Sequence, residues 1–215
     1  MKKRIFATGV TLALASSLVA PAAMASTDPA EATGTMSLAA VLTADGNQFD
    51  SNWYDYDIVT EAVLAVLAAK PDSAVGVLAD GTTPVTAFIP NDRAFGRLAR
   101  DLTGTWPSTE KATFNALAEA VGIDAIESVL LYHVVPGVTI DSGMALKADG
   151  AKLNTALPGT MFTVDVKSMR DKVIILRDND RNDANPFIKR QAFDINKGNK
   201  QIAHGITRVL RPMDL

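Results

Sequence analysis

The sequence predicts an α+β fold, with helices mainly in the N-terminal half and mostly antiparallel strands in the C-terminal half. Two observations lead to this prediction. Residues 37–135 place apolar side chains at helical spacing, between prolines and capping residues. From residue 138 onward, short β-branched runs alternate with Gly, Pro, Asn and Asp. A group of helices followed by a group of strands is typical of the α+β class.

The first helices are predicted from the spacing of apolar residues. Leu38, Val41 and Leu42 follow the i, i+3, i+4 pattern of one helix face. Residues 58–69 also have a helical pattern, but they are apolar nearly all round, so we expect burial on several sides. Asp57 is predicted to cap the start of this helix.

A strand and three more helices complete the N-terminal half. Residues 84–89 (PVTAFI) are β-branched and aromatic and predict a strand. A helix should follow, capped by Asn91 or Asp92. The last two helices are predicted to begin at 107–108 and at the capping-box-like pair Asp124 and Glu127, and the Pro-Gly pair at 136–137 ends the second.

The C-terminal half is predicted to contain strands separated by turns. Turn formers stand at 149–150, 158–159 and 196–199. The predicted strands are 138–140, 161–166, 173–176, 192–195 and 206–210.

The N-terminus has the three-part pattern of a secretory signal peptide. Three positive charges in residues 1–4 precede an uncharged run over 5–20, and Ala23 and Ala25 provide an A-x-A cleavage motif. The uncharged run is short and contains polar residues, which argues against a transmembrane anchor. We therefore expect cleavage after residue 25 and a secreted, extracellular protein with no membrane span.

The expected domain organisation follows from this pattern. Residues 1–25 are the signal peptide, 26–36 a flexible lead-in and 37–215 a single domain, because no linker or repeat interrupts the rest of the chain. Without the signal peptide, the net charge changes from −3 to −6. Residues 26–146 carry 16 acidic and 5 basic side chains, whereas residues 147–215 carry 8 acidic and 13 basic ones. The basic part is either an ordinary solvated surface or a contact face for acidic cell-wall polymers.

Composition excludes several functional classes. The chain has no cysteine and two histidines, which excludes disulfides, thiolate zinc sites, Fe–S clusters and multi-histidine metal centres. The acidic balance gives no general attraction for nucleic acid. Nucleophile-elbow, Walker A and dinucleotide-binding motifs are absent from the sequence. We expect no enzyme activity and no cofactor; a carboxylate-based hydrolase is the remaining enzymatic alternative.

Three segments resemble the fasciclin (FAS1) domain family. They are residues 86–95 (TAFIPNDRAF), 131–137 (LYHVVPG) and 202–212 (IAHGITRVLRP), in the order and spacing of that family. The resemblance covers about 37–215. The closing segment departs from the family pattern by one extra residue, and residues 177–190 look like an insertion between two late strands.

The resemblance implies a FAS1-like β-wedge or sandwich with a helical layer, in secreted or surface proteins used for adhesion. It implies partner contacts for Tyr132 and His133, and for Asp194 and Ile195, which stand where the family carries an Asp-Ile pair. The partner would be an extracellular protein or a cell-wall polymer. The competing interpretation places Tyr132 and His133 in the core, hydrogen-bonded to backbone. His204 is expected to hold the terminal strand by a side-chain hydrogen bond.

Three local features have alternative interpretations. Asp178, Asp180 and Asn182 fall at alternate positions, as in a calcium loop, but the later ligand positions do not match and a solvated turn explains the run equally. The aromatic residues at 53–56 either stack on a sugar or pack a helix start onto the core. The apolar helix at 58–69 also suits a carrier of an apolar small molecule, such as a pigment or lipid, in a groove between helices and sheet.

Overall fold

A computed structural model describes residues 34–44, 46 and 48–214 of this chain. All of them belong to one compact unit, Glu31–Leu215. The predicted signal peptide at 1–25 and residues 26–33 of the predicted lead-in lie outside the described residues. Within the described part of the chain, no helix has the length and apolar character needed to cross a membrane.

The elements confirm the α+β class, with the longer helices in the N-terminal half. The helices are α1 (Leu38–Leu42), α2 (Asp57–Ala69), α3 (Asp92–Thr103), α4 (Glu110–Tyr132) and α5 (Ser142–Ala145), with 3-10 helices at Ala74–Ala79 and Arg190–Ala192. The strands are β1 (Val85–Pro90), β2 (Val134–Pro136), β3 (Lys152–Asn154), β4 (Met161–Ser168), β5 (Val173–Arg177) and β6 (Gln201–Ile206).

The strands form two three-stranded sheets. One has the order β2-β1-β6 and the other β3-β4-β5. All pairs are antiparallel except β1 and β6, which run parallel over their full length, from Val85 opposite Gln201 to Pro90 opposite Ile206. The first and the last strand of the described chain are therefore neighbours.

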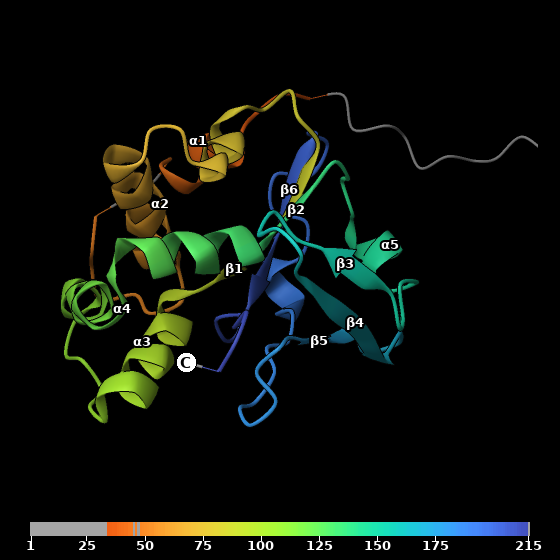
Figure 1. Cartoon of the computed structure of the whole chain (residues 1–215). Helices are drawn as coiled ribbons and strands as arrows, with labels where there is room; N and C mark the ends of the chain where they lie inside the picture. The colour runs from red at the N-terminus through yellow and green to blue at the C-terminus, as the bar shows by residue number, and fades with distance from the viewer. Residues whose placement is uncertain (1–33, 45, 47, 215) are drawn as a thin grey trace, which may run out of the picture. The chain divides into compact units, whose positions relative to one another are not determined.

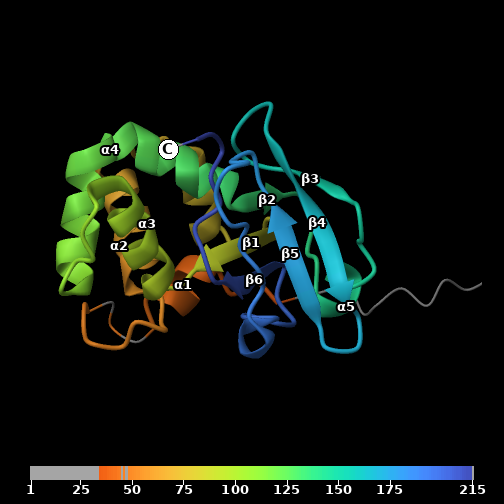
Figure 2. The same cartoon turned by 90° about the horizontal axis from the view of Figure 1, so that it is seen from below.

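Strand β1 separates two apolar cores. Val85, Ala87 and Ile89 pack in a cluster with side chains of α1 to α4, whereas Phe88, on the opposite face, packs with residues of β4 and β5. This is the period-two alternation of a strand that is buried on both faces. Helices α2, α3 and α4 accordingly lie on one side of β1 and β6, and the β3-β4-β5 sheet lies on the other (Figure 1, Figure 2).

Helix boundaries differ from the sequence prediction at three points. Asp57 is the first residue of α2, and the cap comes instead from Asp92, whose carboxylate accepts from the backbone N–H of Ile58 at 2.8 Å. Helix α4 begins at Glu110, and its two predicted helices are joined at Gly122, which has φ +74° and ψ 169°. Glu127 forms no capping box; its carboxylate accepts hydrogen bonds from Lys70 and Ser73.

Strand positions were predicted well where pairing is local. The predicted strands at 161–166 and 173–176 are β4 and β5. The predicted strand at 138–140 is wrong, because β2 ends at Pro136 and residues 138–140 are irregular. The predicted strand at 192–195 contributes only an isolated bridge between Ile195 and Ala203. The predicted final strand at 206–210 is placed too late in the sequence, because β6 ends at Ile206.

Candidate functional site

Tyr132 is the last residue of α4 and lies in the core between the two sheets. Its side chain is fully buried, in edge-to-face contact with the ring of Phe162. Its hydroxyl donates to the carbonyl oxygen of Met161 at 3.0 Å. Burial raises the pKa of this phenol above its usual range. Tyr132 thus fixes the end of α4 to β4.

His133 follows directly and is also buried. Nδ1 lies 2.7 Å from the carbonyl oxygen of Val129, and Nε2 accepts from the N–H of Leu210 at 2.9 Å. These bonds assign the proton to Nδ1. Burial lowers the pKa of the imidazole to about 4, so it is neutral at pH 7. The interpretation of Tyr132 and His133 as core residues hydrogen-bonded to backbone is confirmed, and partner contact through them stays a prediction.

His204 and Asp194 form a second polar unit on β6 and the segment before it. Nε2 of His204 lies 2.8 Å from the carbonyl oxygen of Ile140, and Nδ1 accepts from the N–H of Asp194 at 3.2 Å. The Asp194 carboxylate accepts from Ser142, through both N–H and hydroxyl, and from Lys197. Burial opposes ionisation of Asp194, but these hydrogen bonds outweigh it and lower its pKa. The expectation for His204 is confirmed, and Asp194 has its carboxylate committed to internal bonds.

Ile195, in contrast, lines a surface groove. The groove is about 520 Å³ in volume and is formed by Tyr54, Tyr56, Lys189, Gln191, Ala192 and Ile195. Beside it lies a second hollow of about 170 Å³, formed by Tyr54, Asn91, Arg93, Arg97, Lys189 and Thr207. Tyr54 and Lys189 belong to both, and we call the two together the Tyr54 groove.

The Tyr54 groove combines an exposed aromatic ring with several cations. Tyr54 is 59% exposed. The Lys189 ammonium lies 4.8 Å from the centre of its ring, and the Arg93 guanidinium lies 6.0 Å from it. Both are within the range of cation–π attraction. Arg97, from the same helix as Arg93, donates to the carbonyl oxygen of Thr207 at 2.6 Å.

The positive charge of this groove is not neutralised by neighbouring acids. Arg93, Arg97 and Lys189 line the groove, and neither they nor the neighbouring Arg208 form an ion pair with any described carboxylate. Burial lowers the pKa of Arg97, and repulsion from Arg208, Arg93 and Arg100 lowers it further. Burial and Arg97 likewise lower the pKa of Lys189. An anion placed here would relieve like-charge repulsion that the folded protein otherwise retains.

Two tryptophans stabilise the helix that carries the arginines. Trp53 and Trp106 lie with their ring centres 5.6 Å apart, over Gly96 of α3. A Cβ atom at Gly96 would lie 2.8 Å from the Trp106 ring, so this close approach requires glycine. Trp53 therefore packs against α3, as one interpretation of the aromatic residues at 53–56 predicts. Stacking of the exposed Tyr54 on a sugar stays a prediction.

The predicted calcium candidates contact an arginine. Asp178 and Asp180 surround Arg211: Asp178 accepts from its N–H at 2.9 Å, and Asp180 accepts from its guanidinium at 3.2 Å. Asp183 and Asp101 also pair with this guanidinium. Because Asp180 is buried, the solvated-turn interpretation is wrong for it. Asn182 lies exposed, with its N–H directed to Asp180 at 3.3 Å.

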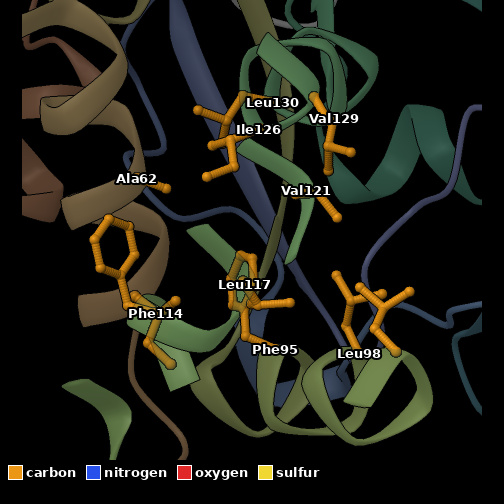
Figure 3. A pocket seen from close by; sticks show the side chains of 12 residues that line it. Ala62, Phe95, Leu98, Phe114, Leu117, Val121, Ile126, Val129 and Leu130 are labelled. Carbon is orange, nitrogen blue, oxygen red and sulfur yellow. The ribbon is translucent and has the colours of Figure 1, made fainter. Parts of the chain in front are cut away.

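An apolar cavity lies among the helices. It is bounded by α2, α3 and α4, not by the sheet as the sequence suggested (Figure 3). Its open volume is about 40 Å³, far below the ~300 Å³ at which small-molecule pockets begin. The lining is entirely apolar: Ile58, Ala62, Phe95, Leu98, Leu102, Phe114, Leu117, Val121, Ala125, Ile126, Val129 and Leu130.

The comparison with protein-family models agrees with the sequence motifs. Residues 60–212 match the family model described as the fasciclin domain. No curated protein matches the chain. Among solved structures, a FAS1 domain pair from the insect cell adhesion molecule fasciclin I is similar at 16% identity with a TM-score of 0.49, and the match covers 71% of this chain and 46% of that one. The match to this chain thus spans less than half of that protein. Since the family model covers most of the 215 residues, the chain belongs to the fasciclin domain family.

Proposed function

We propose that this chain is a secreted, non-enzymatic interaction module that binds an acidic polymer at the cell surface or in the extracellular matrix. The observation that carries this proposal is the Tyr54 groove, in which three cations without carboxylate partners, Arg93, Arg97 and Lys189, lie beside an exposed tyrosine. Family membership supports the interaction role, since the similar insect protein is a cell adhesion molecule. The signal-peptide pattern at 1–25 supports secretion.

The chemistry of the groove suits a polymer that has both rings and acidic groups. The Tyr54 face offers a stacking surface for a sugar ring, and Arg93, Arg97 and Lys189 offer donors for carboxylate, sulfate or phosphate. Arginine binds such groups through two parallel hydrogen bonds, which adds geometric selectivity to charge attraction. The larger hollow beyond Lys189, lined by Gln191 and Ile195, gives room for a neighbouring unit of the chain.

Binding to purified polymers tests this function. The wild-type protein should bind uronic-acid-bearing and phosphate-bearing polysaccharides and not neutral ones, and added salt should weaken binding because exposed charges are screened. The double variant Arg93→Ala/Lys189→Ala should lose about tenfold or more in affinity. The matched control is Arg170→Ala/Lys172→Ala, which removes two exposed positive charges elsewhere and should change affinity much less. Equal losses in both double variants would show nonspecific charge attraction and would reject the groove.

Partner contact through Tyr132 and His133 is a separate prediction of the resemblance. Both side chains are buried, so a partner would have to displace the residues that cover them. Folded variants at these positions that bind a partner as well as wild type does would contradict it.

A carrier of an apolar molecule is the second candidate function, supported by the all-apolar cavity among α2, α3 and α4. Because the open volume is small, a pigment or lipid would enter only if these helices separate. Organic extraction of purified protein followed by mass spectrometry should recover a bound apolar compound, and Ala62→Trp should exclude it. A colourless protein with an empty extract would rule out this candidate.

A further inference from the structure

Five acidic side chains gather at the segment that contains Tyr54, and the groove does not explain them. The oxygens of Asp55, Asp92 and Glu110 lie within 4.8 Å of one another, and those of Asp50, Asp55 and Asp57 form a second such set that shares Asp55. They come from the segment before α2 and from the first residues of α2, α3 and α4. Three helices thus begin around one cluster of negative charge.

Two oxygens of the cluster are buried without a hydrogen-bond donor among the described residues. They are Oδ1 of Asp55 and Oε1 of Glu110. Glu110 is fully buried, although its second oxygen accepts from the N–H of Asp50 at 2.7 Å. A buried carboxylate oxygen without a partner is costly, which points to a cation or a proton held between these carboxylates.

Within the described part of the chain, Asp55, Asp92 and Glu110 form no ion pair with lysine or arginine. Carboxylates held this close repel one another unless a cation or a proton lies between them.

We propose that Asp55, Asp92 and Glu110 bind a divalent metal ion, and that the ion is Ca²⁺. Carboxylate oxygens are the hard ligands that Ca²⁺ and Mg²⁺ prefer. Two oxygens bound to one Ca²⁺ at about 2.3–2.6 Å lie at most about 5 Å apart, so the spacing of the cluster suits this ion. Ca²⁺ accepts irregular sets of ligands, whereas Mg²⁺ demands near-octahedral geometry. Three carboxylates from different segments, one half-buried and two buried, therefore favour Ca²⁺.

The ion would join Asp55 to the starts of α3 and α4. Asp55 follows Tyr54 in the sequence, and the same short segment contains Trp53. Bound Ca²⁺ would therefore hold the segment that presents Tyr54 to the groove.

Titration of chelator-treated protein with CaCl2 at pH 7 tests the proposal. Calorimetry should show one ion bound per chain, and thermal unfolding should move upward by several degrees, because a ligand that binds only the folded state stabilises it. Glu110→Gln should weaken Ca²⁺ binding about tenfold or more while keeping an acceptor for the Asp50 N–H. Glu119→Gln, an exposed carboxylate on the same helix, is the control and should bind as wild type does.

Thermal unfolding of the Glu110→Gln variant without Ca²⁺ provides a second measurement. Without Ca²⁺, Glu110→Gln should unfold at a higher temperature than wild type, since it removes like-charge repulsion, yet it should no longer respond to the ion. Absence of heat and of a thermal shift with CaCl2 overturns the proposal, and a rise in unfolding temperature on acidification alone assigns the cluster to shared protons instead. An equal response to MgCl2 overturns the choice of Ca²⁺.

Discussion

His133 is a buried, neutral imidazole whose protonation would disturb the core. Both ring nitrogens have backbone partners, one on α4 and one at Leu210 near the C-terminus. A protonated ring would place a second N–H against the N–H of Leu210, with no acceptor for it. Burial lowers the pKa of this imidazole to about 4.

We expect His133 to make the protein sensitive to acid. The unfolded chain takes up the proton near pH 6.5 and the folded chain only near pH 4, so stability is lost as pH falls through that window. The difference in unfolding free energy between wild type and His133→Gln should shrink by about 2 kcal/mol from pH 7 to pH 5. Urea unfolding at the two pH values measures it, and a constant difference would contradict a neutral, buried imidazole.

The hydroxyl of Tyr132 should contribute measurably to stability. Tyr132→Phe keeps the ring in its contact with Phe162 but leaves the Met161 carbonyl without its donor. We expect a loss of about 1 kcal/mol in denaturant unfolding. Tyr54→Phe removes the same atom from an exposed ring and should change stability by less than about 0.5 kcal/mol. Similar losses in both variants would be inconsistent with this assignment.

Among the elements, α4 depends on one residue for its path. Gly122 has φ +74° and ψ 169°, a conformation that is open essentially only to glycine. It turns the chain between the segment that packs under Phe49 and the segment that ends at Tyr132. Without this bend, the second half of α4 would point in another direction and would not cover the core.

Gly122→Ala should therefore destabilise the protein. The added Cβ meets no neighbouring atom within 4 Å, so the cost comes from the backbone alone, about 1–3 kcal/mol. The matched control is Gly76→Ala, in the 3-10 helix Ala74–Ala79, where φ is ordinary and the nearest atom is 3.7 Å away. Thermal unfolding should separate the two variants, and an unchanged Gly122→Ala would show that α4 tolerates a straighter path.

The elements also show what sequence patterns can predict. Helix α2, strand β1, the Asn91 cap of α3 and the hairpin of β4 and β5 follow local rules, and each lies within a residue or two of its predicted position. Strand β2 was missed because three residues after a helix have no pattern of their own; β1 imposes the strand by pairing Val135 with Thr86. The cap of α2 was misassigned for the same reason, since Asp92 comes from another helix.

For the candidate site too, the sequence indicated single residues but not the contacts that bring them together. Tyr54 and Ile195 were both candidates in the sequence, one as a stacking ring and one by resemblance, but nothing in the pattern placed them in one groove. Lys189 and Arg97 join them only through the fold. The five-carboxylate cluster is likewise made of residues from four separate segments.

At the scale of the whole described unit, Arg211 links parts that no strand pairing joins. Its guanidinium is nearly buried and contacts Asp101 at the end of α3 and Asp180 and Asp183 in the segment after β5. The helical side and the β3-β4-β5 side of the molecule therefore share one ionic centre near the C-terminus.

Removing this centre should be costly. Arg211→Ala leaves the buried carboxylate of Asp180 without a counter-charge, and we expect a loss of about 3–5 kcal/mol in unfolding free energy. Arg181→Ala removes an exposed arginine from the same segment and should have little effect. Guanidinium chloride unfolding compares them; losses of similar size would show that Arg211 acts only through net charge.

The parallel pairing of β1 and β6 has a consequence for how the protein is made. Strand β1 emerges from the ribosome early, but one of its two edges has no partner until residues 201–206 have also been synthesised. A short hairpin cannot close this pair, because the whole of residues 91–200 must be arranged between the two strands. The sheet β2-β1-β6 therefore cannot be completed during synthesis until this last strand is available.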